Sequence, residues 1–259
     1  MKIKLIAAVF SAMLIAEAAL AVQGTITVNG SSRKGDIRYR ARDKMYLLSS
    51  QRKGGAMIEI EYKASDVEKL DIPKPQNFDR AKDLVSKGQG TSAISILQEI
   101  VGTYKKLVWD IPAGRYLVEA YLDANNAQKA YETAQGIIRE NKESAYMGDL
   151  APAYWKALLK LGKQQQLEDL LGKAVTEGDR RSSAAAQILR GDIILATAGE
   201  NPENIRKALV DGYLRVSLMY KDEECRDICK EAMEKAAQCF DKIGWAERAE
   251  KLRSQARMM

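Results

Sequence analysis

A turn residue that recurs every 37 residues is the feature that most restricts how this chain can fold. Gly88, Asn125, Gly162 and Gly199 are separated by 37 residues each, and Gly244 follows after a further 45. In all of these units except the one at Gly199, a large apolar side chain lies four residues before the turn residue, and an alanine or leucine lies five residues after it. Glycine and asparagine permit a tight turn, and a small residue lets a second helix pack closely on the first. The spacing therefore predicts stacked pairs of antiparallel helices.

The fourth interval departs from this regular pattern in two ways. The segment "GENPEN" at residues 199–204 predicts a longer turn in the fourth pair. The spacing of 45 residues that follows predicts an insertion of one or two helical turns before the fifth pair.

The repeated positions resemble those of the tetratricopeptide repeat (TPR) family, in a slightly lengthened form. The matching residues are Ala81, Leu84, Gly88, Ala93 and Leu97 in the first unit, Val118, Tyr121, Ala130 and Ala134 in the second, Trp155, Leu158, Gly162 and Leu171 in the third, and Ala237, Phe240, Gly244 and Ala249 in the last. The resemblance implies an α-solenoid over residues 76–259 with about five helical hairpins. It also implies a groove, lined by the first helix of each pair, that binds a protein partner.

In the TPR pattern, one groove-facing position lies six residues before the turn. Here that position is occupied by Lys82, Glu119 and Lys156. The alternative is that these three are ordinary solvated charges on helix surfaces.

Residues 22–75 have the period of strands rather than helices. Alternating or β-branched segments occupy 25–29, 36–41, 44–50 and 57–63, and a last strand is expected within 64–75. We expect a small closed barrel, because closure removes exposed strand edges. The order of these strands resembles the Sm-like type of small barrel. The predicted fold class is therefore α+β and multidomain, mainly α, with an all-β module before the solenoid.

The first 21 residues have the three parts of an export signal. A positive start at 1–4 precedes an apolar core at 5–16 and a small-x-small cleavage site at 19–21, so the mature chain is expected to begin at Val22. The alternative is an uncleaved N-terminal anchor. No later apolar run is long enough to span a bilayer. These features predict an exported protein, in the periplasm or cell envelope of a bacterium.

The net positive charge of the chain lies near its N-terminus. Residues 22–63 contain nine basic and four acidic side chains, whereas 64–259 contain 30 of each sign. Three arginines alternate along one predicted strand, and other basic residues flank them. The candidate anion-binding residues are Arg33, Lys34, Arg38, Arg40, Arg42, Arg52 and Lys53. Clustered arginine binds phosphate and carboxylate groups, although a half-buried strand also needs polar residues on its outer face.

Side chains for catalysis or metal binding are scarce. The sequence contains no histidine and three cysteines, Cys225, Cys229 and Cys239, which we interpret as small core residues on a helix. Motifs of serine hydrolases, phosphate-binding loops and zinc proteases are absent. We predict no catalytic residue, metal or cofactor.

Two hypotheses follow from the sequence. The first is an exported, non-enzymatic scaffold that binds a protein in its groove and docks on an anionic surface through the basic β-module. The second is a module whose barrel binds an envelope lipid or glycan directly. An export signal argues against nucleic acid as the partner.

Overall fold

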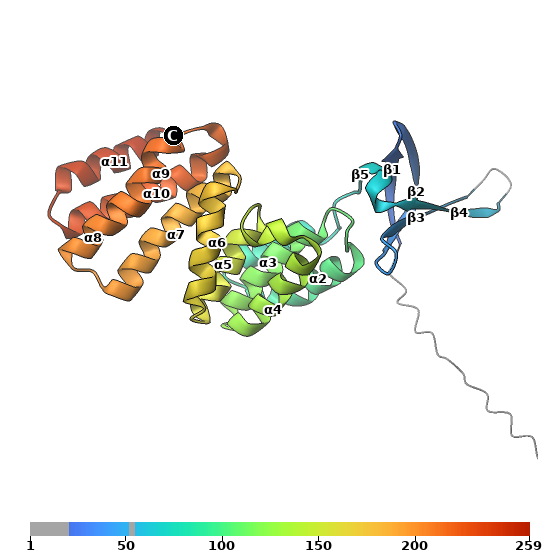
Figure 1. Cartoon of the computed structure of the whole chain (residues 1–259), viewed down its shortest axis with the longest axis horizontal. Helices are drawn as coiled ribbons and strands as arrows, with labels where there is room; N and C mark the ends of the chain where they lie inside the picture. Colours follow the sequence, from blue (N-terminus) through green and yellow to red (C-terminus); the bar gives the residue numbers. More distant parts are fainter. Residues whose placement is uncertain (1–20, 52–54) are drawn as a thin grey trace, which may run out of the picture. The chain divides into compact units, whose positions relative to one another are not determined.

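The structure, a computed structural model, describes residues 21–51 and 55–259. The chain divides between Pro73 and Lys74 into two compact units, a sheet and a set of helices (Figure 1). The predicted export signal lies outside the described residues apart from its last residue, Ala21. Arg52 and Lys53 also lie outside them.

The first unit is one antiparallel sheet of five strands in the order β4-β3-β2-β1-β5. The strands are β1 (Val22–Val28), β2 (Ser31–Arg40), β3 (Met45–Gln51), β4 (Met57–Lys63) and β5 (Val67–Asp71), and the 3-10 turn η1 (Ala64–Asp66) joins the last two. Alternation along the strands places Ile26, Ile37 and Leu48 on one face, and each is at most 1% exposed. These three side chains form the centre of the sheet's core.

The expectation of a closed barrel is wrong, because the sheet is open. Strand β5 pairs with β1, with Ile26 opposite Leu70, so β4 and β5 become the two edges. Both edges carry charge at alternate or adjacent positions, including Glu59 and Glu61 on β4 and Lys69 on β5. Charged edge strands resist pairing with other chains. They therefore give the protection that closure of a barrel would otherwise supply.

The second unit consists of five helical hairpins. Their helices are α1 (Phe78–Ser86) with α2 (Gly90–Thr103), α3 (Asp110–Asp123) with α4 (Ala127–Glu140), α5 (Leu150–Lys160) with α6 (Gln164–Thr176), α7 (Arg180–Ala198) with α8 (Pro202–Ala208) and α9 (Leu214–Met219), and α10 (Arg226–Lys242) with α11 (Ala246–Met258). The π-turn η3 (Leu209–Tyr213) joins α8 to α9, and the 3-10 turns η2 (Lys142–Ala145) and η4 (Glu223–Cys225) precede α5 and α10.

Four of the five hairpin turns have the same backbone geometry. Each has three residues, and the second residue has positive φ: Gly88 (69°), Asn125 (56°), Gly162 (66°) and Gly244 (78°). The third residue of each turn donates its N–H to the carbonyl four residues before the recurring turn residue, over 2.8–3.0 Å. This hydrogen bond is typical of a helix ended by a left-handed residue. The recurring residues of the sequence are thus the ones that end the first helices.

The fourth turn differs in register rather than in length. It also has three residues, 199–201, but the glycine comes first, with φ 80°. Asn201 caps α8 by accepting from the N–H of Asn204 over 2.9 Å, and Pro202 begins the helix. The predicted lengthening of this turn is therefore wrong. The extra residues lie in the helices, because α7 has 19 residues and its partner continues through η3 to Met219.

Buried alanine and leucine side chains at the predicted positions pack the two helices of four hairpins together. Ala93, Ala130, Leu167 and Ala249, five residues after their turns, are fully buried. The three cysteines are free and buried, as the sequence predicts, and burial raises the pKa of the Cys225 thiol to about 11. Such a thiol is protonated at neutral pH, so it acts as a small apolar residue.

Candidate functional site

The three predicted groove residues lie around one cavity. Lys82 is on α1, Glu119 on α3 and Lys156 on α5, and together they line a hollow of about 600 Å³ on the first helices of three successive hairpins. Repeated hairpins place equivalent residues on the same side of a solenoid. A shared offset from the turn therefore becomes a shared surface.

Two further sets of residues with the same spacing line this cavity, which we call the groove. Three apolar residues lie three positions before the turn residue, namely Val85, Leu122 and Leu159. Ser86, Asp123 and Lys160 lie two positions before it, and Arg115 and Tyr116 of α3 complete the lining. None of these residues is among those predicted from the sequence to face the groove. The 37-residue spacing could have revealed the first two sets, but not Arg115 and Tyr116, which have no such equivalents.

One cation of the groove is already paired within it. The Nε of Arg115 donates to Oε1 of Glu119 over 3.2 Å, and its guanidinium lies 5.0 Å from the centre of the Tyr116 ring. Burial alone would lower the pKa of Arg115, but the charge of Glu119 and their hydrogen bond outweigh it, so the pKa is raised. Arg115 therefore stays charged, and its position on α3 is fixed.

The lysines of the groove are not engaged in this way. Among the described residues, Lys82, Lys156 and Lys160 have no ion-pair partner, and all three side chains are exposed. Asp123 is the acidic lining residue that likewise lacks an ion pair with any described side chain. The groove thus presents three ammonium groups against one carboxylate, beside a strip of apolar side chains. This arrangement suits a ligand with both acidic and apolar groups.

The arginines of the basic strand are arranged differently from the prediction. Arg38 and Arg40 share one face of β2, but the strand ends at Arg40, and Arg42 lies in the following turn. Arg38 pairs with Glu59 at 2.7 Å, and Arg40 pairs with Glu61 at 2.9 Å and with Asp43 at 2.7 Å. Hydrogen bonds to these two acids raise the pKa of Arg40. The glutamates of β4 therefore neutralise two of the three arginines.

The other basic candidates do not all share a surface with this pair. Alternation along β2 places Lys34 on the face of Arg38 and Arg40, whereas Arg33 leaves the opposite face, that of Ile26. Arg42 is 73% exposed and lies 3.9 Å from Asp43. Including residues 64–73, which hold three acidic residues and one basic residue, lowers the net charge from +5 over 22–63 to +3 over 22–73. The whole sheet unit is therefore less basic than residues 22–63 alone suggest.

Within residues 21–51 and 55–259, no group of three or more Cys, Asp or Glu side chains is placed to hold a metal ion. No described helix has the length and apolar content needed to cross a membrane.

Comparisons with known proteins assign this chain to no family. No family model matches the sequence, and no curated protein matches it. Among solved structures, a variant of the kinesin light chain TPR-like repeats of Podosopora anserina has a TM-score of 0.46 and 17% identity, covering 70% of this chain and 92% of that one. A structure of MamA has a TM-score of 0.41 and 16% identity, covering 72% of this chain and 95% of that one. Such low TM-scores establish no shared fold, so the hairpin architecture rests on the chain's own turns and helices.

Proposed function

We propose that this protein is a non-enzymatic scaffold that binds an acidic polypeptide segment in the groove formed by α1, α3 and α5. The observation that carries this proposal is the set of three ammonium groups, from Lys82, Lys156 and Lys160, beside the apolar strip of the same cavity. Three helices from successive hairpins supply these side chains, so the groove extends across hairpins rather than lying within one.

The two parts of the groove have different roles in such binding. Apolar side chains of the partner would be buried against Val85, Leu122 and Leu159, and burial of apolar area is the main source of affinity. The lysines would select for carboxylates and speed the encounter, since electrostatic complementarity acts mainly on specificity and association rate. The Arg115–Glu119 pair holds one side of the groove in a fixed arrangement.

A panel of peptides tests this function. The peptides have equal length and constant leucine content, and their net charge varies from acidic to basic. We expect the acidic peptides to bind most tightly, and their affinity to fall as ionic strength rises, because salt screens the lysine charges. The variant with Lys82, Lys156 and Lys160 all changed to Glu should prefer the basic peptides instead.

A matched control variant changes three exposed lysines outside the groove, Lys105, Lys142 and Lys251, to Glu. This variant has the same net charge as the groove variant but should keep the preference for acidic peptides. An unchanged preference in the groove variant, or an equal change in the control, would show that the groove is not the binding site.

We further propose that the scaffold works outside the cytoplasm, in the periplasm or envelope of a bacterium. This proposal rests on the charged start, apolar core and small-residue cleavage site within residues 1–21. N-terminal sequencing of the chain recovered from the periplasmic fraction tests it. Val22 as the first residue is the expected result, and recovery of the intact chain in the cytoplasm would refute export.

A second candidate function is the binding of an envelope lipid or glycan by the sheet unit. The observation that favours it is the exposure of Arg42, with Arg33 and Lys34 exposed at the other end of β2. Docking through this unit should weaken steeply with salt. Since Arg38 and Arg40 are held in ion pairs, replacing Arg33, Lys34 and Arg42 with Gln should abolish it without loss of folding. Retained binding in that variant would exclude the sheet as the docking site.

A further inference from the structure

The second helix of the fourth hairpin has an unusual outer face. Helix α8, the π-turn η3 and helix α9 follow one another without a break from Pro202 to Met219. On its inner side, Leu209, Tyr213 and Val216 are buried. On its outer side, Val210 is 61% exposed and Leu218 is 69% exposed, and Met219 at its end is 64% exposed. These are three of the seven large hydrophobic side chains that are exposed in the described part of the chain.

The π-turn explains how these side chains come to lie on one side. A π-turn takes up one residue more than an α-helical turn. Val210 and Leu218 are eight residues apart, and with the extra residue this separation corresponds to two turns, so both point outward with half-buried Leu214 between them. The inner side is fixed to α7, where the Tyr213 hydroxyl donates to Oδ1 of Asp192 over 2.7 Å.

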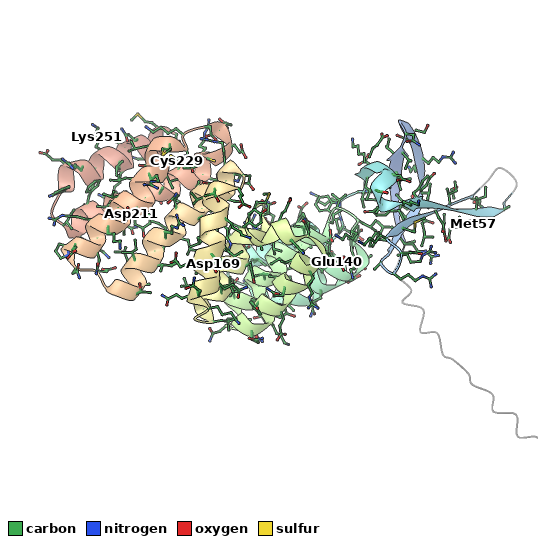
Figure 2. The ribbon with its side chains drawn as sticks, viewed as in Figure 1. Met57, Glu140, Asp169, Asp211, Cys229 and Lys251 are labelled. Atoms are coloured by element: carbon green, nitrogen blue, oxygen red, sulfur yellow. The ribbon has the colours of Figure 1, made fainter. Side chains whose placement is uncertain are left out.

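Basic residues flank this apolar line. Arg206, Lys207, Arg215 and Lys221 are exposed, and none of them forms an ion pair with another described residue. Asp211, labelled in Figure 2, is the single acidic residue between positions 206 and 221. The segment therefore has a net charge of +3. We call Val210, Leu214, Leu218 and Met219 with these four cations the α8–α9 face.

We propose that the α8–α9 face docks on the surface of an anionic phospholipid bilayer. Large apolar side chains that protrude from a helix enter the boundary between lipid headgroups and acyl chains, while lysine and arginine pair with the lipid phosphates. None of the residues of this face lines the groove or the cavity between α10 and α11. A second copy of the chain is a poorer occupant, because two such faces would bring like charges together.

Co-sedimentation with vesicles tests this docking, with the full chain and vesicles of phosphatidylcholine with or without phosphatidylglycerol. We expect binding to the anionic vesicles and much weaker binding to phosphatidylcholine alone. Each cation near an anionic surface contributes roughly a factor of five, so changing Arg206, Lys207 and Arg215 to Gln should lower the partition coefficient about a hundredfold at low salt. Arginine, lysine and glutamine have similar helix propensities, so the helix should persist.

Two control variants separate docking from general effects. Changing Lys105, Lys142 and Lys251 to Gln removes the same charge elsewhere and should lower the partition coefficient only slightly. For the apolar part, Val210→Gln with Leu218→Gln should reduce binding, whereas Met57→Gln with Met258→Gln, at residues 64% and 77% exposed, should not. Met57 and Lys251 are labelled in Figure 2. Residues 1–20 are common to all variants, so differences among them report on the substituted positions.

Three results would overturn the proposal. The first is equal binding by the α8–α9 variants and their controls. The second is equal binding to vesicles with and without phosphatidylglycerol. The third is a dimer, seen by sedimentation velocity without lipid, that the Val210→Gln and Leu218→Gln changes dissociate, because the face would then be occupied by a second copy. The groove variants should bind vesicles normally, so this proposal and the peptide-binding function can fail separately.

Discussion

At the scale of single residues, the hairpin turns depend on residues that tolerate positive φ. Gly162 has φ 66°, and a side chain there would have open space but a strained backbone. Asn125 adopts a similar conformation, with φ 56°. Asparagine and glycine are the residues that enter the left-handed region most readily. Glycine or asparagine therefore recurs at these turns because the backbone conformation requires it, and not because its side chain has a chemical role.

A pair of glycine substitutions tests this requirement. Gly162→Ala should lower the free energy of unfolding by about 1 kcal/mol, because alanine is strained at positive φ. Gly136→Ala should raise it by up to about 1 kcal/mol, because Gly136 lies within α4 with open space around it. Urea denaturation measures both values. Changes of the same sign would contradict the role assigned to the turn residue.

Asp179 is the residue whose ionisation most clearly supports a helix end. Its Oδ1 accepts from the N–H of Ser182 and its Oδ2 from the N–H of Gly148, both over 2.8 Å. Burial would raise the pKa of Asp179, but these N–H donors outweigh it and the pKa is lowered. A lowered pKa means that the carboxylate stabilises the fold above its unfolded pKa near 3.8. This stabilisation is lost as the pH falls below that value.

The change Asp179→Ala should therefore cost about 1 kcal/mol of stability at neutral pH, the usual value of a helix N-cap. In acid the two proteins should converge, since the wild type loses the same interaction when Asp179 is protonated. Thermal unfolding measures the difference from pH 6 down to pH values well below 3.8, because the lowered pKa of Asp179 extends its titration below that value. A difference that stays constant with pH would mean that the carboxylate charge is not involved.

At the scale of elements, a neighbouring strand of the sheet determines whether a charged side chain is free or held in an ion pair. Arg38 and Arg40 are predicted from β2 alone to form a free basic face, but β4 brings Glu59 and Glu61 to them. The alternation of "MIEIEYK" shows that both glutamates share a face. It does not show that this face is the arginine face, because that depends on the register between strands.

Charge reversal on the sheet distinguishes an arginine that stabilises the fold through ion pairs from one that is only exposed to solvent. Arg40→Glu should lower the thermal midpoint of the sheet unit, because it places a third acid beside Asp43 and Glu61. Adding Glu61→Arg should restore part of the loss by re-forming a pair of opposite charges. Arg42→Glu should leave the midpoint nearly unchanged, since Arg42 is exposed and outside the strand. A similar loss in both single variants would contradict this distinction.

The helical elements could be predicted more completely than the sheet. Each hairpin is local in sequence, so the turn residue, the small buried residue and the groove position could all be read from one repeated spacing. Closure of the sheet could not, because it requires β5 to pair with β4 as well as with β1, and the alternation along a strand does not show which strands it pairs with. The fourth hairpin falls between these cases. Its insertion was visible in the spacing, but its location within α7 and the π-turn was not.

At the scale of the whole molecule, two surfaces of the helical unit have distinct chemistry. The groove combines free lysines with apolar side chains in a hollow, and the α8–α9 face combines free cations with protruding apolar side chains. They lie on different hairpins, and no residue of the α8–α9 face lines the groove. A scaffold of this kind would hold an acidic polypeptide segment at an anionic membrane surface.

Site-specific photo-crosslinking in cells tests most directly whether the groove holds an acidic segment. A crosslinking residue is placed at Ser86 in the groove, or at the exposed control position Gln128 on α4. Mass spectrometry then identifies the partner segment joined at each position. We expect position 86 to capture segments rich in Asp and Glu and position 128 to capture none of them. Basic or neutral segments at position 86, or the same acidic segments at both positions, would contradict the account.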